Sequence, residues 1–201
     1  MGADLSQNML RSAQEHLAPH LGSRVHLLAC DLLHLPFRRV FDVIVSTAAF
    51  HWVLDHDRLF KNLCAALVHG GWLEAQCGGG PNLVRLRERA NALMTVARFA
   101  PYFVGFREPW LYQGAEGAAA TLSHAGFIKV ETSVEAATTV LQDANDYREF
   151  VRNIIFHRHL ENLPSEELRA EFIDKLTDLA MKDDPPFELD YWRLNLRGRS
   201  T

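Results

Sequence analysis

The fold is decided by the stretch Phe41-Asp42-Val43-Ile44-Val45-Ser46-Thr47-Ala48-Ala49-Phe50-His51-Trp52. Its β-branched beginning is typical of a short strand covered on both faces, and the small residues after Val45 indicate where that strand ends. Two earlier apolar runs end at carboxylates, Asp4 and Asp31. Because open α/β sheets bind ligands at the carboxyl ends of their parallel strands, this succession of strand ends predicts a nucleoside site.

Strand and helix patterns alternate through the first part of the chain. The spacing of Leu5, Met9, Ala13 and Leu17 predicts an amphipathic helix that Ser6 caps. Further along, the pattern predicts strands over 24–30, 41–45 and 72–76, and a helix that Asp55 or Asp57 opens and Gly70-Gly71 stops. Helix-length connections between strands indicate a mostly parallel sheet.

The second half is more helical and ends in a strand. The apolar stripes predict helices along Leu83–Ala97, Ala118–Leu122, Tyr147–Ile155 and Leu168–Leu179, and strands over 127–134 and 187–196. The length of 201 residues favours one domain over 1–201, in which 81–112 and 143–183 are helical lid or insertion segments. We expect Gly78-Gly79-Gly80 to form a flexible loop before the next helix.

The composition is ordinary for a soluble protein, with 48% hydrophobic and 23% charged residues. A net charge of -4 with dispersed Lys and Arg argues against nucleic acid as a partner, and no apolar run is long enough to span a membrane. Three cysteines favour buried free thiols in a reducing cytoplasm. His157 and His159 point to different sides of a predicted helix, and no metal site is predicted.

Several short motifs follow one another along the chain: Gly2-Ala3-Asp4-Leu5-Ser6 with Met9-Leu10, Asp31-Leu32, Phe41–Ser46, Ala49–Trp52 and His69-Gly70-Gly71. In this order and spacing they resemble class I S-adenosylmethionine-dependent methyltransferases. The resemblance implies a Rossmann-like, mostly parallel sheet with a helical insertion before its last strand. Phe50-His51-Trp52 and the insertion Tyr147–Lys182 look like the trans-aconitate methyltransferase group.

The resemblance implies S-adenosyl-L-methionine as the cofactor, with contacts at Asp4, Leu5, Asp31, Leu32, Thr47 and Ala48. Asp4 would accept hydrogen bonds from both ribose hydroxyls, which a carboxylate can do bidentately. Asp31 would accept from the adenine amino group, and Leu32 would donate its backbone amide to the ring. Thr47 and Ala48 would line the methionine end. Taken singly, Asp4 also fits a helix cap and Asp31 a turn residue.

The first strand of that family and its glycine-rich turn are missing, since only three residues precede Asp4. The family's sheet order puts this strand in the middle, and a strand–helix–strand unit takes roughly 30 residues. Unpaired buried backbone groups cost about 1–3 kcal/mol each, so the sheet should not persist intact with a gap. Three explanations stay open: truncation of a longer chain, re-pairing or dimerisation through exposed strand edges, and loss of catalysis in a degenerate relative.

Methyl transfer from a sulfonium is an in-line displacement, so alignment and desolvation carry most of the catalysis. A carboxylate acceptor is ionised at neutral pH and needs no general base. A phenol or amine acceptor would need one, and His51 is then the candidate, with Trp52 as an aromatic wall. Both residues also fit a packed junction between a strand and a helix.

The segment Pro101–Trp110 suits a lid over a small molecule, or a loop pinned by its aromatic side chains. Arg152, His157 and Arg158 form a candidate anion site, with a solvated helix face as the alternative.

We predict a cytoplasmic enzyme that methylates a small-molecule acceptor, through a carboxylate oxygen. The alternative is a catalytically inactive module acting through protein contacts, and exposed strand edges favour a homodimer.

Overall fold

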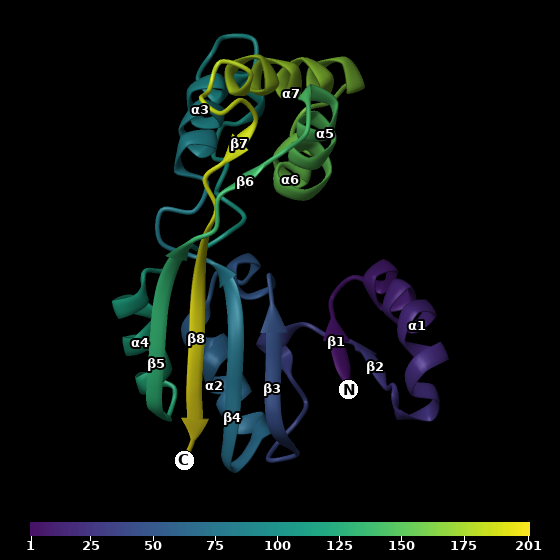
Figure 1. The fold of residues 1–201 in the computed structure, drawn as a ribbon, viewed down its shortest axis with the longest axis vertical. Coiled ribbons are helices and arrows are strands. Elements are labelled where there is room, and N and C mark those ends of the chain that lie inside the picture. The colour runs from purple at the N-terminus through teal and green to yellow at the C-terminus, as the bar shows by residue number, and fades with distance from the viewer. The chain divides into compact units, whose positions relative to one another are not determined.

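A computed structural model describes residues 1–201, and packing divides the chain into two compact units, described separately (Figure 1). Unit 1 consists of Met1–Cys77, Glu116–Thr132 and Asn195–Thr201, and unit 2 of Gly78–Ala115 and Ser133–Leu194. The assignment of the whole chain to one domain stays a prediction. No helix is both long enough and apolar enough to cross a membrane.

Unit 1 carries the alternating strands and helices that the sequence predicted. In chain order its elements are β1 (Gly2–Asp4), α1 (Gln7–Leu21), η1 (Gly22–Arg24), β2 (Leu27–Ala29), η2 (Leu32–His34), β3 (Phe41–Thr47), η3 (Phe50–Trp52), α2 (His56–Ala66), β4 (Leu67–Gly78), α4 (Ala115–His124), β5 (Phe127–Ala136) and β8 (Trp192–Ser200). Strands β5 and β8 continue into unit 2. The predicted strand over 24–30 is shorter than expected, because 22–24 form a 3-10 turn.

The strands form two separate sheets. Strands β1 and β2 pair in parallel, from Gly2 opposite Leu27 to Asp4 opposite Ala29, and the other sheet has the order β3-β4-β8-β5. Strands β3 and β4 are parallel, whereas β8 runs against β4 (Figure 1). Strands β1 and β3 do not pair with each other, so each has a strand neighbour on one edge only. Re-pairing of β1 with β3 is therefore not what the structure shows.

The core of unit 1 lies under α2. Asp55 caps this helix by accepting a hydrogen bond from the Arg58 N–H at 2.9 Å, as one of the two predicted starts required. Leu59, Phe60 and Leu63 are fully buried on its inner face. Helix α1 differs, because it contains no buried residue: Leu5 and Met9, which precede and begin its apolar stripe, are 69% and 60% exposed.

The prediction that Gly70-Gly71 stops a helix is wrong. Helix α2 ends at Ala66, and both glycines lie inside β4. There the register with β3 jumps, from Phe41 opposite Leu67 to Val43 opposite Trp72. Gly70 has φ +80°, and a Cβ on Gly71 would lie 2.9 Å from the Asp42 carbonyl oxygen. The glycines therefore permit a bulge and a close backbone approach in the strand.

Unit 2 is mostly helical. Its elements are α3 (Val84–Met94), η4 (Ala100–Tyr102), β6 (Thr139–Val140), α5 (Ala144–Phe150), the π-helix η5 (Val151–Ile155), α6 (His157–Leu160), α7 (Glu166–Ala180) and β7 (Glu188–Leu189). Phe99, Phe156 and Phe172 form its aromatic core, with Phe172 in edge contact with the other two rings. The predicted strand over 187–196 is split: β7 pairs with β6, and β8 begins only at Trp192.

Gly79 and Gly80 form the predicted loop before α3, but this loop is closely packed and not the open segment that was expected. Gly78 and Gly79 are buried. A Cβ on Gly79 would lie 2.4 Å from Leu194 Cβ and 2.8 Å from the Gln113 carbonyl oxygen. Gly80 donates its N–H to the same carbonyl oxygen at 2.8 Å. Glycine is required here because the backbone passes directly against a neighbouring strand and loop.

This packing predicts that Gly79→Ala lowers the free energy of unfolding by about 1–3 kcal/mol, because the new methyl group overpacks the contact with Leu194. Gly117→Ala is the matched control, since nothing lies within 4 Å of its added Cβ and the position is inside α4. Gly117→Ala should raise the free energy of unfolding by about 0.5–1 kcal/mol, because alanine is favoured over glycine inside a helix. Urea unfolding followed by circular dichroism measures both, and equal effects of the two substitutions would refute the packing argument.

Candidate functional site

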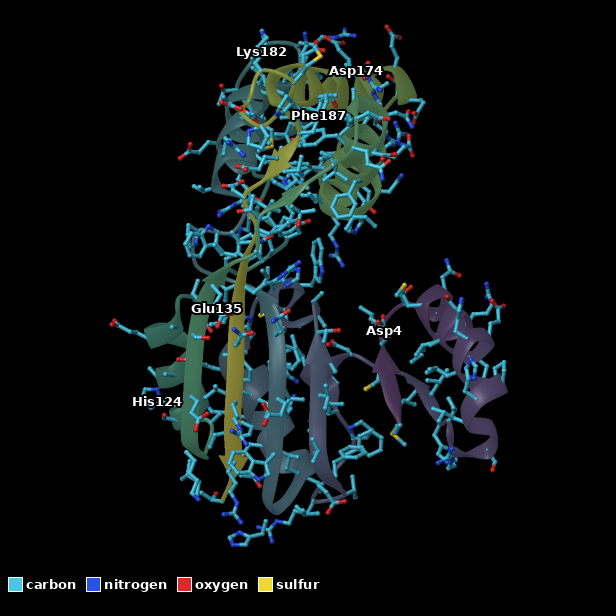
Figure 2. All side chains as sticks on the ribbon, in the orientation of Figure 1. Asp4, His124, Glu135, Asp174, Lys182 and Phe187 are labelled. Carbon is cyan, nitrogen blue, oxygen red and sulfur yellow. The ribbon has the colours of Figure 1, made fainter.

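The carboxyl ends of β1 and β2 bring Asp4 and Asp31 to one end of the small parallel sheet. Asp4 is the last residue of β1 (Figure 2). Its carbonyl oxygen accepts a hydrogen bond from the Cys30 N–H at 3.0 Å. Asp4 Oδ1 accepts from the Ser6 N–H at 2.7 Å, just before α1. Oδ2 has no partner within the chain, so half of this carboxylate is available to a ligand.

Asp31 is more fully engaged than Asp4. Oδ1 accepts a hydrogen bond from the Leu33 N–H at 2.8 Å and caps η2, and Oδ2 lies 3.0 Å from His34 Nδ1. The Leu33 N–H, and after it the His34 side chain, hold the pKa of Asp31 below its usual value. The turn interpretation is therefore correct for Asp31, and a ligand would have to replace His34 at Oδ2.

Asn62, which the sequence gave no reason to select, fixes the turn after Asp31. Asn62 Nδ2, on α2, donates to the Leu32 carbonyl oxygen at 3.1 Å. The Leu32 N–H has no acceptor within the chain, which matches the predicted role of this amide as a donor. Leu5 follows Asp4 with its side chain exposed, so only its place beside Asp4 connects it to the site.

A second group of predicted residues follows β3. Thr47 ends the strand opposite Gln76, and the Ala48 N–H donates to the Gln76 carbonyl oxygen at 2.8 Å. Ala48 has φ +55°, a left-handed conformation that a residue with a Cβ adopts at a cost of roughly 1–2 kcal/mol. The left-handed conformation of Ala48 turns the chain sharply at the end of β3. Strained backbone of this kind is concentrated at functional sites.

His51 and Trp52 lie in the short helix η3 after this turn. His51 is buried, Trp52 is half-buried, and their ring centroids are 5.1 Å apart. The turn is held by His56, whose Nε2 donates to the Phe50 carbonyl oxygen at 3.0 Å. His51 is thus packed at this junction, and its catalytic role stays a prediction. The two groups, Asp4 with Asp31 and Thr47 with Trp52, lie at the ends of different sheets.

In unit 2, the segment Pro101–Trp110 is pinned by its aromatic side chains. Phe103 and Trp110 are buried, and Phe103 packs against Phe172 with ring centroids 5.8 Å apart. Beside them, fully buried His159 has its Nε2 3.3 Å from Glu108 Oε2, without the alignment of a hydrogen bond. Burial lowers the pKa of His159, and Glu108 opposes that shift.

Residues 1–75 match the family profile described as a methyltransferase domain. Among curated proteins, the chain is 31% identical over 120 residues to a trans-aconitate 2-methyltransferase of Rhodopseudomonas palustris, covering 58% of this chain and 39% of that protein. It is 28% identical over 105 residues to malonyl-[acyl-carrier protein] O-methyltransferase 1 of Ilyobacter polytropus, covering 52% and 38%. The matched region therefore spans about two fifths of either relative.

Among solved structures, a phosphoethanolamine N-methyltransferase of Haemonchus contortus, crystallised with S-adenosylhomocysteine, aligns with 99% of this chain and 42% of its own, with a TM-score of 0.56 and 19% identity. This likeness shows the fold, and it confirms the predicted Rossmann-like α/β architecture. The resemblance to class I S-adenosylmethionine-dependent methyltransferases is likewise confirmed, and trans-aconitate methyltransferases are among the relatives.

The strained turn predicts that glycine substitutions at two neighbouring positions affect stability differently. Ala48→Gly removes the left-handed strain and should leave stability unchanged or slightly higher, because the gain offsets the entropy of a freer unfolded chain. Ala49, with φ -109°, is the matched control. Ala49→Gly should be less stable than Ala48→Gly by about 1 kcal/mol in urea unfolding. The reverse order would show that Ala48 is not strained.

Buried His159 predicts acid sensitivity of unit 2. The unfolded chain binds a proton at His159 near pH 6.5, whereas the folded protein resists it because burial lowers the pKa. The stabilising effect of neutral His159 is thus complete above about pH 6.5 and is lost as the pH falls, with a slope of at most about 1.4 kcal/mol per pH unit.

His159→Phe should flatten this part of the pH profile of the free energy of unfolding, measured in urea between pH 5 and 8. His124→Gln is the control, because His124 is exposed at the end of α4 (Figure 2). That control should keep the acid sensitivity of the unsubstituted protein. An unchanged profile for His159→Phe would mean that other groups cause the acid sensitivity.

Proposed function

We propose that this protein transfers a methyl group from S-adenosylmethionine to a carboxylate oxygen of a small molecule. The observation that carries the proposal is the placement of Asp4 and Asp31 at the carboxyl ends of two adjacent parallel strands, joined by the bond from the Cys30 N–H to the Asp4 carbonyl oxygen. The two curated relatives described above are named as methyltransferases, and each name contains a carboxylic acid or its acyl derivative.

The residues present fit a nucleoside in chemical type. Asp4 would accept from the ribose hydroxyls through Oδ2, which has no partner within the chain. The Leu32 N–H is an unused donor for the adenine ring, and Asp31 would accept from the adenine amino group by exchanging His34. Leu5 would lie beside the ribose contact, and Thr47 and Ala48 would line the methionine end.

The sulfonium supplies an electrophilic methyl group that needs no further activation. When bound, it would present its methyl carbon in line to a carboxylate oxygen of the acceptor, and the electron pair of the C–S bond would pass to sulfur. The transfer would give a methyl ester and a neutral thioether, with no proton to move. Because a carboxylate is already ionised at neutral pH, the protein's contribution is alignment and exclusion of water. Buried His51 and half-buried Trp52 would form an aromatic wall that excludes water from the reacting groups.

A second candidate function is a non-catalytic module acting through protein contacts. The observation in its favour is the apolar stripe of α1, whose large side chains are exposed: Leu5, Met9, Leu17 and Leu21. Strands β1 and β3 each also have an edge that no strand covers. Surfaces of this kind are typical of association with another protein segment.

Calorimetric titration of S-adenosylhomocysteine into the 201-residue chain tests the proposal. We expect micromolar binding, and Asp4→Asn should weaken it about 10- to 100-fold, because hydrogen bonds to a charged group contribute about 1.5–3 kcal/mol. Asp42→Asn is the matched control, since Asp42 is an exposed aspartate near the opposite end of β3.

Equal binding by the Asp4→Asn and Asp42→Asn variants would refute the assigned ribose contact. Absence of binding by the unsubstituted chain, with circular dichroism showing that it is folded, would contradict the methyl-transfer proposal and favour the protein-contact module.

A further inference from the structure

A cleft in unit 2 is lined by basic side chains that the methyl-transfer proposal does not use. It lies between the segment from α5 to α6 and the helix α7, and it has a volume of about 170 Å³. At about 30 Å³ per water molecule, this is room for several waters or a small organic ion. The lining residues are Arg152, Asn153, His157, Leu160, Glu161 and Arg169.

Arg169 gives the cleft a positive charge that no carboxylate of the chain neutralises. Its Nε donates to the Leu163 carbonyl oxygen at 3.0 Å, which fixes the plane of the half-buried guanidinium group. No carboxylate lies within ion-pair distance of Arg169. The terminal nitrogens of the guanidinium therefore remain as donors in a fixed orientation, the geometry that binds carboxylates and phosphates bidentately.

Arg152 supplies a second cation whose present partner is replaceable. Its Nη2 contacts Glu166 Oε1 at 2.5 Å, and the Glu166 side chain is 67% exposed. An ion pair with so exposed a carboxylate contributes little net stability. An anion held between two guanidinium groups would compete with it readily. His157, also on the lining, adds ring nitrogens that can hydrogen-bond to an anion.

The backbone around Arg152 is unusual in a way that supports a binding role. Val151–Ile155 form a π-helical turn, closed by the bond from the Phe156 N–H to the Val151 carbonyl oxygen at 2.8 Å. Val151 and Ile155 are buried, so the turn is anchored from inside while Arg152 and Asn153 face the cleft. Turns of this type cost hydrogen-bond geometry and are frequently found at functional sites.

We propose that this cleft is a binding site for a small carboxylate or phosphate anion, held by Arg169 and Arg152 with His157 at its rim. The site differs from the anion site predicted from the sequence, because Arg158 is exposed and is not part of the lining. Arg169 takes its place from α7, 17 residues beyond Arg152 along the chain. The inference does not depend on methyl transfer.

Titration with malonate and with inorganic phosphate, followed by NMR of the histidine side chains at constant ionic strength, tests the site. We expect the NMR chemical shifts of the His157 ring to change saturably as anion is added, with a dissociation constant of roughly 1 mM or lower. The malonate and phosphate arms show whether carboxylate or phosphate is preferred. Arg169→Gln should weaken binding about tenfold, because it removes the fixed guanidinium group.

Two further variants guard against misfolding and non-specific charge effects. Glu161→Gln removes a negative charge from the lining, breaks no hydrogen bond, and should tighten binding about two- to threefold. Arg158→Gln is the matched control and should leave the affinity unchanged. A shift that does not saturate with either anion, or equal weakening by Arg158→Gln and Arg169→Gln, would overturn the proposal.

Discussion

Main-chain pairing between parallel strands is the constraint on which unit 1 depends. Every strand in it must satisfy the hydrogen-bonding groups of two edges, and β1 and β3 have a strand neighbour on only one. The β1–β2 pair is three residues long and is closed by the bonds from the Gly2 N–H to His26 and from the Cys30 N–H to Asp4. A two-stranded sheet of this length is only marginally stable by itself. The proposed nucleoside contacts therefore lie on the part of unit 1 that main-chain pairing stabilises least.

Elements with local signals could be predicted from the sequence. Ser6 and Asp55 cap α1 and α2 as expected, because a cap involves only residues three positions apart. The parallel pairing of β3 with β4 could also be inferred, because a helix-length connection between two apolar runs imposes it. The same reasoning placed Asp4 and Asp31 at neighbouring strand ends, where the structure has them.

Features that depend on distant contacts could not be predicted. Gly70-Gly71 resemble a helix stop in isolation, but pairing with β3 extends β4 back to Leu67 and turns them into a bulge. Gly79 resembles a flexible linker in the sequence, but in the structure it packs against Leu194, which lies 115 positions later in the chain. Arg169 has no motif at all, and its relation to Arg152 arises only when α7 packs beside the π-turn.

The predicted helix cap at Asp4 is wrong, because Ser6 caps α1. Even so, local hydrogen bonds and ligand binding are compatible at both carboxylates, to different degrees. At Asp4, the bond from the Ser6 N–H to Oδ1 holds the side chain in place and leaves Oδ2 available, so binding would cost little further side-chain entropy. At Asp31, Leu33 and His34 engage both oxygens. The Leu33 bond can persist, but a ligand at Oδ2 must displace an exposed histidine. In the proposed complex, Asp4 therefore contributes more to affinity than Asp31, whose larger contribution is to position the Leu32 amide.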